Sequence, residues 1–397
     1  MDSRINRRNF ILSATALGGA AAIGGVLPRS ARAQSGKLKV GLMLPYSGTY
    51  AQLGNAIENG FRLFLLERGG RLAGREVEIV KVDDESDPAK APENTSRLIK
   101  RDKVDLLVGT VHTGVAMAML KQSRETGTLH IIPNAGAGAA TGALCAPNVF
   151  RTSFTNWQAI YPLGKHVYGK GQKTAVWITW KYGAGEEAGE GFKEGFVKAG
   201  GRILRELHLP FPQVEFQPLL TEIASIRPDA VVCFFAGAAG AKFIKDYAAA
   251  GLKNKIPLYS SFLTEGILDA VGNAAEGIET TAHYGDSLDM KKNDEFRLAY
   301  AKAFGSNADV FAVQGYDTAQ LFAAGIEAVK GDVDDRKGII AAMESAVIDS
   351  PRGVWTMSKA HNPIQDIYLR RVVGNENKVV GIAHKALADP ALGCRMV

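Results

Sequence analysis

One stretch of the chain has the glycine spacing of a dinucleotide-binding loop. Residues 183–188 read Gly-Ala-Gly-Glu-Glu-Ala and fit G-x-G-x-x-A between an apolar run and a helical pattern. In that motif the free N–H groups at a helix N-terminus hold a pyrophosphate. Glu186 and Glu187 would place two negative charges where the pyrophosphate must lie. The chemistry therefore argues against this site, and the sequence has no G-x-S-x-G, H-E-x-x-H or Walker A motif.

A second loop could hold an anion. Residues 37–44 form a short apolar run rich in branched side chains, which is typical of a buried parallel strand, and residues 45–48 interrupt it. From Tyr50 the apolar positions recur at helical spacing until the glycine pair 69–70. The free N–H groups from Tyr50 to Leu53 would face a ligand at the carboxyl end of the strand, and they favour a negative charge.

The first 33 residues have the features of a twin-arginine signal peptide. Arg7 and Arg8 precede an Ala/Gly-rich apolar run, and Ala31-Arg32-Ala33 supplies a small-x-small cleavage site. The run is too short and too rich in glycine for a transmembrane helix, so we expect a periplasmic protein beginning near Gln34. Five Arg and one Asp lie in this segment, so without it the formal net charge falls from +6 to +2. No cluster of basic and aromatic residues remains, which argues against nucleic-acid binding.

The three cysteines divide into two kinds. Cys233 lies inside an apolar run and is expected to be an inert core residue. Cys145 and Cys394 lie in polar segments rich in Pro and Gly, and export favours oxidation. We predict a disulfide between them that holds the C-terminal tail, residues 386–397. The absence of C-x-x-C spacing and of His clusters argues against a metal site, and no cofactor is expected.

Strands and helices alternate along the chain in two series. Helical patterns separate the expected strands, which are 37–44, 76–82, 105–109 and 130–132 in the first series and 174–180, 203–209, 230–235 and 256–260 in the second. The rest of the chain completes the two sheets, with helices at 293–304, 310–329 and 337–346 and strands at 277–283, 354–357 and 367–373. This order predicts an α/β fold of two doubly wound parallel-sheet lobes.

The chain is expected to cross between the lobes three times. We assign residues 34–152 and 286–349 to lobe 1, and residues 153–285 and 350–385 to lobe 2. The crossings fall at Arg151–Phe154, His283–Gly285 and Ser350–Gly353. Three short polar segments of backbone favour a hinge over a rigid joint.

Loop motifs along the chain occur together in the order found in one family. They are P-Y-S-G at 45–48, G-T-V-H-T-G at 109–114, I-I-P-N-A-G at 131–136, F-R-T-S at 150–153, W-K-Y-G-A-G at 180–185, G-N-A-A-E-G at 272–277 and Q-G-Y-D-T-A at 314–319. In this order they resemble the leucine/isoleucine/valine-binding family of periplasmic solute-binding proteins. The resemblance covers nearly the whole mature chain. It implies the type I periplasmic binding protein fold, a three-strand hinge, no catalysis, and delivery of solute to ABC permease subunits in the inner membrane.

The resemblance also implies a set of ligand-binding residues. The family's carboxylate-holding Ser/Thr falls at His112-Thr113, and its backbone donor falls at Ala135. The Thr113 hydroxyl and the N–H groups of Ala135 and Gly136 would then form a small anion nest. The candidate ligand-binding residues are Leu53, His112, Thr113, Asn134, Ala135, Gly136, Phe154, Trp157, Tyr182, Phe235, Ala236, Ser260, Phe262 and Tyr316.

Two departures from the amino-acid binders bear on the ligand. Those proteins have a Thr after the backbone donor, whereas this chain has Gly-Ala-Gly at 136–138. They also have an acidic residue where this chain has Ser-Ser-Phe at 260–262, and the nearest acid here is Glu265. A buried ammonium without a carboxylate costs on the order of several kcal/mol, which favours a carboxylate that has no amine. Five aromatic residues near the expected cleft suggest an apolar or aromatic body: Phe154, Trp157, Tyr182, Phe235 and Phe262.

The chain resembles the aromatic-acid branch of the family in this respect. A branched-chain amino-acid-binding protein of the same fold is the first alternative, because Glu265 could swing in. A twin-arginine-exported, dinucleotide-dependent enzyme is the second, and a sensor domain that binds solute without transport is a third. Several site residues also have a plainer interpretation: Phe154 and Trp157 could pack between the lobes, and Phe235 could belong to the core.

Overall fold

The computed structural model describes residues 36–261 and 263–397, apart from the side chain of Glu265. The expected twin-arginine segment and the candidate residue Phe262 lie outside these residues. The described chain forms two parallel-sheet lobes, so the predicted fold class is confirmed.

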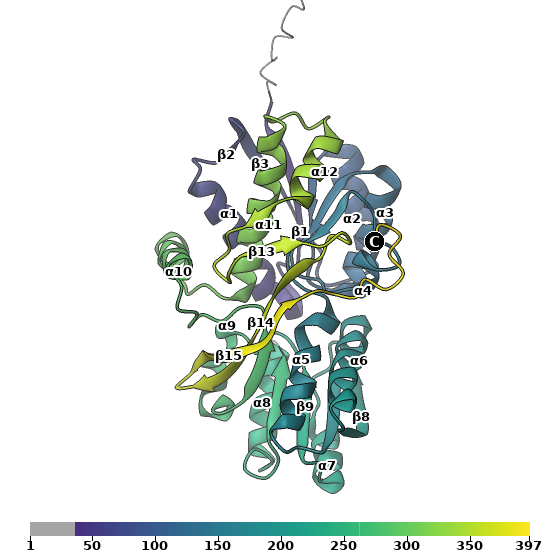
Figure 1. The fold of residues 1–397 in the computed structure, drawn as a ribbon, viewed down its shortest axis with the longest axis vertical. Coiled ribbons are helices and arrows are strands. Elements are labelled where there is room, and N and C mark those ends of the chain that lie inside the picture. The colour runs from purple at the N-terminus through teal and green to yellow at the C-terminus, as the bar shows by residue number, and fades with distance from the viewer. Residues whose placement is uncertain (1–35, 262) are drawn as a thin grey trace, which may run out of the picture. The chain divides into compact units, whose positions relative to one another are not determined.

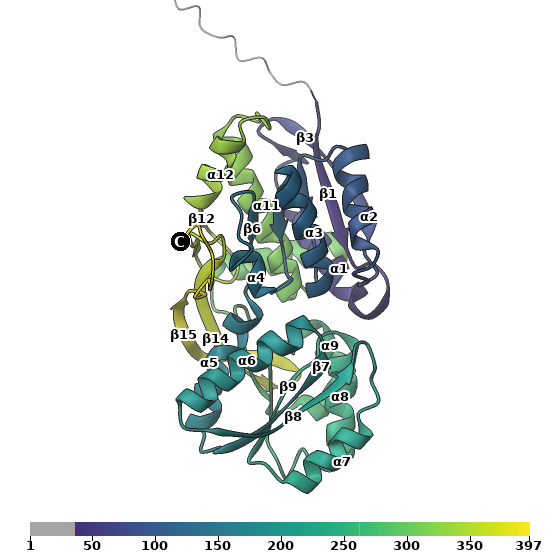
Figure 2. The ribbon, with the colours of Figure 1, turned by 90° about the vertical axis from the view of Figure 1, so that its right-hand side faces the viewer.

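The first sheet contains six strands in the order β2-β3-β1-β4-β5-β6. Figures 1 and 2 show β1 and β3 of this sheet in the upper half of the ribbon. The strands are β1 (Leu38–Leu44), β2 (Arg71–Leu72), β3 (Arg75–Asp83), β4 (Leu106–Val108), β5 (Leu129–Ile132) and β6 (Val149–Arg151). All neighbours are parallel except β2 and β3. Nearly every residue of β1 is buried, as expected for a central strand covered on both faces.

Helices from two distant parts of the chain belong to this lobe. The N-terminal ones are α1 (Ala51–Leu66), α2 (Ala91–Ser96), α3 (Thr113–Thr126) and α4 (Gly138–Thr141), and the later ones are α10 (Lys291–Phe304), α11 (Val310–Ala328) and α12 (Arg336–Glu344). Helix α11 packs against α1 and α12. A Cβ atom at Gly60 would lie 1.8 Å from the Ala312 carbonyl oxygen, and one at Gly315 would lie 1.9 Å from that of Ile57. Glycine at these positions therefore lets the backbones of α1 and α11 touch.

The second sheet has the order β12-β13-β14-β11-β10-β9-β7-β8, with β15 paired to β14. Its strands are β7 (Thr174–Lys181), β8 (Arg202–Pro210), β9 (Ala230–Phe234), β10 (Leu258–Ser261), β11 (Glu279–Ala282), β12 (Val347–Ile348), β13 (Trp355–Met357), β14 (Pro363–Val373) and β15 (Glu376–Leu387). Strands β7 to β11 pair in parallel, whereas β14 is antiparallel to β11, β13 and β15. The helices of this lobe are α5 (Asn156–Gly169), α6 (Gly183–Lys198), α7 (Gln217–Ile226), α8 (Ala238–Ala249) and α9 (Glu265–Val271).

Several elements differ from the sequence expectations, among them α6, α7 and β15. Helix α6 begins at Gly183, so the glycines of the G-x-G-x-x-A match lie inside its first turn and form no loop before it. Helix α7 was not expected, and strand β15 continues into the segment assigned to the tail. Most residues of β15 are exposed, so this strand lacks the apolar alternation by which a strand is identified.

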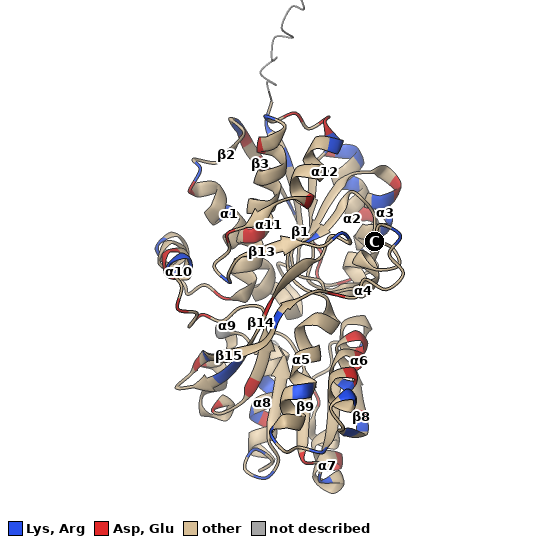
Figure 3. Ribbon diagram, viewed as in Figure 1, with Lys and Arg blue, Asp and Glu red and all other residues tan. Residues whose placement is uncertain are grey.

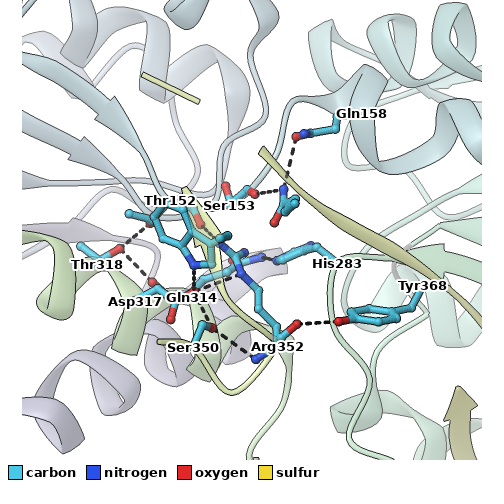
Figure 4. A network of polar contacts seen from close by, with 12 residues as sticks. Thr152, Ser153, Gln158, His283, Gln314, Asp317, Thr318, Ser350, Arg352 and Tyr368 are labelled. Atoms are coloured by element: carbon cyan, nitrogen blue, oxygen red, sulfur yellow. Dashed lines mark hydrogen bonds and ion pairs between the residues drawn. The ribbon is translucent and has the colours of Figure 1, made fainter. Parts of the chain in front are cut away.

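Side chains from each expected crossing meet in one buried polar network around α11 (Figure 4). Arg352 donates to the Thr152 carbonyl at 2.7 Å and pairs with Asp317 of α11 at 3.1 Å. His283 lies 3.2 Å from the amide nitrogen of Gln314, and Ser350 donates to Asp317 at 2.9 Å. The three segments are therefore joined through one helix, and their action as a hinge stays a prediction.

The C-terminal tail is linked to the first lobe by a disulfide and to the second lobe by a hydrogen bond. Cys145 and Cys394 form the disulfide that the sequence analysis predicted, with Cα atoms 5.5 Å apart. The Thr155 hydroxyl, at the N-cap of α5, donates to Asp389 of the tail. Cys233 is free and buried in β9.

Surface charge is mixed in the part of the chain that the structure describes. Figure 3 shows acidic and basic residues interspersed on α6, α8 and α10, where several form pairs one helical turn apart. None of the helices within residues 36–261 and 263–397 has the length and apolar character needed to cross a bilayer. Across those same residues, we find no group of His, Cys, Asp and Glu placed to bind a metal ion.

Candidate ligand-binding site

A small cavity lies where strand ends and helix N-termini from the two sheets meet. It measures ≈ 30 Å³ and is lined by Tyr50, Leu53, Val111, Thr113, Asn134, Gly136, Phe154, Asn156, Tyr182, Ala184, Phe234, Ala236 and Phe311. A buried water needs about 10–15 Å³ measured in this way, so the lining side chains leave space for roughly two waters. A larger ligand can enter this closed conformation only if the walls move apart.

Thr113 places a hydroxyl at this cavity. It is the first residue of α3, and the preceding His112 caps the helix by accepting the Gly114 N–H at its Nδ1 atom, 3.1 Å away. Thr113 is only 6% exposed, and its Oγ1 atom has no hydrogen-bond partner. Leaving a buried polar group unpaired costs about 1–3 kcal/mol. The Thr113 hydroxyl is therefore available to a ligand at little further cost.

The loop from Ala135 to Gly138 is oriented by Arg151. This fully buried arginine, at the end of β6, donates to the Ala135 carbonyl at 3.0 Å and also to the Ala137 carbonyl. Each of these carbonyls shares a peptide unit with the N–H of the next residue, Gly136 or Gly138. A trans peptide unit has its C=O and N–H on opposite sides, so both N–H groups point away from Arg151. A Cβ atom at Gly136 would lie 2.4 Å from the Asn156 Oδ1 atom, so this position requires glycine.

A carboxylate from α6 lies behind the same loop. Glu187 accepts the Gly138 N–H, with both of its oxygens within 3.2 Å, and accepts a hydrogen bond from Asn156 Nδ2 at 2.7 Å. Burial raises the pKa of Glu187. Asn156 is thus held between Glu187 and the Gly136 loop, and its backbone N–H donates to the Gly136 carbonyl at 2.8 Å.

Aromatic groups form much of the remaining wall. The hydroxyl oxygens of Tyr50 and Tyr182 lie 3.2 Å apart, and burial raises the pKa of both, so both stay protonated. The Tyr182 ring stacks on Phe234, with ring centroids 6.4 Å apart. Phe154 and Phe311 complete the apolar surface. The cavity thus combines an apolar wall with a few hydrogen-bond donors, as small-molecule sites do.

The structure brings together part of the predicted site. Of the predicted residues, those that line the cavity are Leu53, Thr113, Asn134, Gly136, Phe154, Tyr182 and Ala236. Asn134 is fixed by α11, because its Nδ2 donates to Gln314 at 2.8 Å.

Two predicted residues have backbone roles beside the cavity. Burial lowers the pKa of His112 to about 4, so it is neutral, and its ring packs against Phe211 with centroids 5.0 Å apart. The Ala135 N–H, expected to serve the ligand, donates to the Thr110 carbonyl at 2.9 Å. Neither residue lines the cavity, whereas Gly136 of the same loop does.

Four others lie in packing positions. Trp157 stacks on Tyr161 with centroids 4.4 Å apart, and Phe235 packs against Trp180 in the core. Ser260 donates to the Cys233 carbonyl at 3.1 Å, and Tyr316 donates to Glu67 at 2.7 Å. These four are not in the cavity wall, and Phe262 lies outside the described residues.

Sequence reasoning missed other residues of the wall: Tyr50, Val111, Asn156, Ala184, Phe234 and Phe311. A local sequence pattern could have placed Asn156 at a helix N-terminus. Thr155 and Gln158 form a capping box, which puts Asn156 in the first turn of α5. Phe234 and Phe235 are adjacent on a strand end, and only the observed end of β9 at Phe234 decides which one faces the cavity.

Comparison with known proteins identifies the family. The family model described as periplasmic binding protein matches residues 37–377. The chain belongs to the periplasmic binding protein family. A curated relative, Leu/Ile/Val-binding protein homolog 6 of Brucella melitensis, is 31% identical over 343 residues, which cover 84% of this chain and 87% of the relative. Members of this family are solute-binding proteins, so the alternative of a dinucleotide-dependent enzyme is not supported.

Two solved structures of the family are also similar. The solute-binding protein of an ABC transporter from R. palustris, in complex with benzoate, is 52% identical, with a TM-score of 0.89 and coverage of 91% of this chain and 100% of that one. A second, from Rhodopseudomonas palustris BisB5 in complex with 3,4-dihydroxybenzoic acid, is 31% identical, with a TM-score of 0.84 and coverage of 89% and 99%.

Proposed function

We propose that this chain is the periplasmic solute-binding component of an ABC importer and captures an aromatic monocarboxylate such as benzoate. The observation that carries the proposal is the unpaired, buried hydroxyl of Thr113 beside an aromatic cavity. An ionised carboxylate is the acceptor that such a hydroxyl binds most strongly. Among the lining residues that the structure describes, none is acidic, so an ammonium group would have no carboxylate partner there.

The capture mechanism follows from the positions of the lining residues. Thr113 and Gly136 would hold the carboxylate on the first lobe, where Arg151 has turned the Gly136 N–H toward the cavity. Tyr182 and Phe234 of the second lobe would then cover the ring and exclude water. The hydrogen bond between Tyr50 and Tyr182 joins the two walls in the closed form.

The relatives support this ligand class and leave one alternative. The benzoate complex is formed by a protein 52% identical to this chain. The curated relatives are named for leucine, isoleucine and valine, which keeps a branched-chain amino acid as the second candidate.

A ligand panel separates the two candidates. Thermal unfolding and calorimetric titration would be measured with benzoate, 4-hydroxybenzoate, leucine and valine. A ligand that binds only the folded state stabilises it by about 4 kcal/mol at a thousandfold excess over its Kd. We expect the aromatic acids to raise the Tm and the amino acids to leave it unchanged. Stabilisation by leucine or valine with no response to aromatic acids would overturn the proposal.

We further infer that export uses the twin-arginine route, on the pattern of residues 1–33. The double variant Arg7→Lys/Arg8→Lys should retain the protein in the cytoplasm, as measured by cell fractionation. A matched change at Arg29 and Arg32, outside the pair, should leave export intact. Unchanged export of the double variant would contradict this route.

A further inference from the structure

Two side chains of opposite charge, the fully buried Arg151 and the partly buried Glu187, hold opposite sides of one cavity loop. Arg151 binds the carbonyls of Ala135 and Ala137, and Glu187 accepts the N–H of Gly138. The loop thus presents two N–H groups on the side away from Arg151. The N–H at Gly138 is occupied by the chain's own carboxylate, whereas the one at Gly136 lies at the cavity.

These two N–H groups are close neighbours. Positions 136 and 138 are two residues apart, so their Cα atoms can be separated by at most about 7 Å. A ligand carboxylate bound at Gly136 would therefore lie near the partly buried Glu187 carboxylate. Two carboxylates that share such a site do not readily ionise together.

We propose that closure on an aromatic carboxylate is coupled to the uptake of one proton by Glu187. The inference rests on the proposed function. The ligand keeps its charge, because the Thr113 hydroxyl and the Gly136 N–H both donate to it. The proton comes from the solvent and forms an O–H bond on Glu187, whose carbonyl oxygen continues to accept the Gly138 N–H. No other bond is made or broken.

The surroundings of Glu187 make it the group that titrates. Burial raises its pKa, Asp389 in the tail raises it further, and Arg151 lowers it together with the donors Asn156 and Gly138. Arg151 already donates to acceptors on four residues, including Thr141 and Asn362. The neighbouring acids on the same helix, Glu186 and Glu190, are exposed. Of these three acids of α6, Glu187 is the one that is partly buried and in contact with the cavity loop.

The contact also depends on closure. Gly138 belongs to the first lobe, whereas Glu187 and Asn156 belong to helices that pack together in the second. Opening of the lobes would separate Glu187 from Gly138 and expose it to water, which returns its pKa toward the ordinary range. The closed, liganded form therefore binds more protons than the open form, and falling pH favours it.

Calorimetric titration of benzoate into the wild-type protein tests the coupling. Titrations in two buffers of different ionisation enthalpy, between about pH 5.5 and about pH 8, count the protons taken up. We expect benzoate binding to be accompanied by the uptake of more than zero and at most one proton. The Kd should then fall by at most tenfold for each unit by which the pH is lowered. The variant Glu187→Gln mimics the neutral acid and should bind benzoate without proton uptake, at least as tightly as wild type at neutral pH. The matched control Glu186→Gln should behave like wild type.

Three results would overturn the inference: binding of benzoate by wild type with no proton uptake, equal uptake by Glu187→Gln, or binding by Glu187→Gln that is tenfold weaker at neutral pH. The wild-type proton count stands even if a variant fails to fold. If no aromatic carboxylate binds at any pH, the proposed function fails as well, whereas binding without proton uptake overturns the coupling alone.

Discussion

Residue 113 has opposing effects on stability and binding. Its hydroxyl is buried without a partner in the described structure, so it weakens the free protein, and in the proposed complex it would donate to the ligand. His112 in front of it stays neutral and fixes the first turn of α3, which holds the hydroxyl in place. A side chain that costs stability when the site is free is expected at a binding site.

The variant Thr113→Val separates the two effects. Valine has nearly the same shape and removes only the hydroxyl, so the free energy of unfolding of the free protein should stay unchanged or rise. A hydrogen bond to a charged group contributes about 1.5–3 kcal/mol, so the Kd for benzoate should rise by a factor of about 10 to 150. Urea unfolding and calorimetry measure the two quantities.

Thr126→Val serves as the control, because Thr126 is exposed at the other end of α3. It should leave the Kd for benzoate unchanged. An unchanged Kd in Thr113→Val would show that this hydroxyl does not hold the ligand.

At the residue scale the sequence was informative where a motif was complete. Thr113 and Gly136 could be named, because the loop motifs that contain them resemble those of the leucine/isoleucine/valine-binding family, in which such loops hold the ligand's carboxylate. Asn156 and Glu187 could not be assigned to the site. Their roles depend on the contact between α6 and a loop 49 positions earlier in the chain, which no local pattern reveals.

Helix α11 links the cavity to the segments that cross between the lobes. Gln314 accepts a hydrogen bond from Asn134 of the cavity wall at 2.8 Å. The Gln314 amide nitrogen also lies 3.2 Å from His283 (Figure 4). One turn further, Thr318 lies 2.7 Å from the Thr152 hydroxyl. With the contacts of Asp317 to Ser350 and Arg352, the same helix therefore contacts the cavity wall and all three crossings.

The ion pair between Asp317 and Arg352 should dominate the stability of this network. Both side chains are almost completely buried, and removing one partner of a buried pair costs about 3–5 kcal/mol. We expect Arg352→Met to lower the free energy of unfolding by that amount, and the double variant with Asp317→Asn to recover part of the loss. Urea unfolding of the single and double variants measures the coupling.

The surface pair of Lys292 and Asp349 is the matched comparison. The Lys292 Nζ and Asp349 Oδ2 atoms lie 3.7 Å apart, and both side chains are partly exposed. Lys292→Met should cost less than about 1 kcal/mol. Equal losses of unfolding free energy for Lys292→Met and Arg352→Met would contradict the claim that the buried pair dominates the stability of the network.

At the element scale, long periodic segments were predictable and irregular ones were not. Helix α11 and strand β1 have strong apolar patterns and lie close to the expected positions. Strand β15 has a mostly exposed surface and is stabilised by pairing with β14, which is a tertiary effect. The start of α6 at Gly183 was also missed, since two glycines in a first turn are a poor helix signal.

Burial lowers the pKa of three histidines in the described part of the chain, which keeps them neutral. Burial lowers the pKa of His112 and of His130 to about 4, and holds that of His283 well below its usual range. Below an ordinary His pKa of about 6.5, the unfolded chain binds protons that the folded protein does not, so stability falls as the pH falls. Asp84 has the opposite effect on stability, because burial raises its pKa to about 6. As the pH falls, the folded protein therefore binds this proton before the unfolded chain does.

We expect the free energy of unfolding to decrease between about pH 6.5 and about pH 4, with the histidines outweighing Asp84. His130 alone should contribute on the order of 3 kcal/mol, given the lowering of its pKa from 6.5 to about 4. Urea unfolding across this range measures the effect, and His130→Asn should lose less stability on acidification than wild type. A wild-type stability that is constant or rises over this range would be contrary to expectation.

At the scale of the whole chain, the order of motifs was enough to indicate two lobes and their family. The closed arrangement around a small cavity could not be predicted, because it depends on how Tyr182 and Phe234 of one lobe meet Tyr50 and Phe311 of the other. Sequence patterns describe each lobe separately, whereas the site exists only where the two surfaces come together.

The crystal structure of the benzoate complex is the most direct test of the central claim. We expect the carboxylate within hydrogen-bond distance of the Thr113 Oγ1 and the Gly136 N–H, with the ring against Phe154, Phe234 and Phe311. A complex in which the carboxylate contacts neither donor, or a purified protein that carries an amino acid with its ammonium group paired to Glu265, would contradict this account.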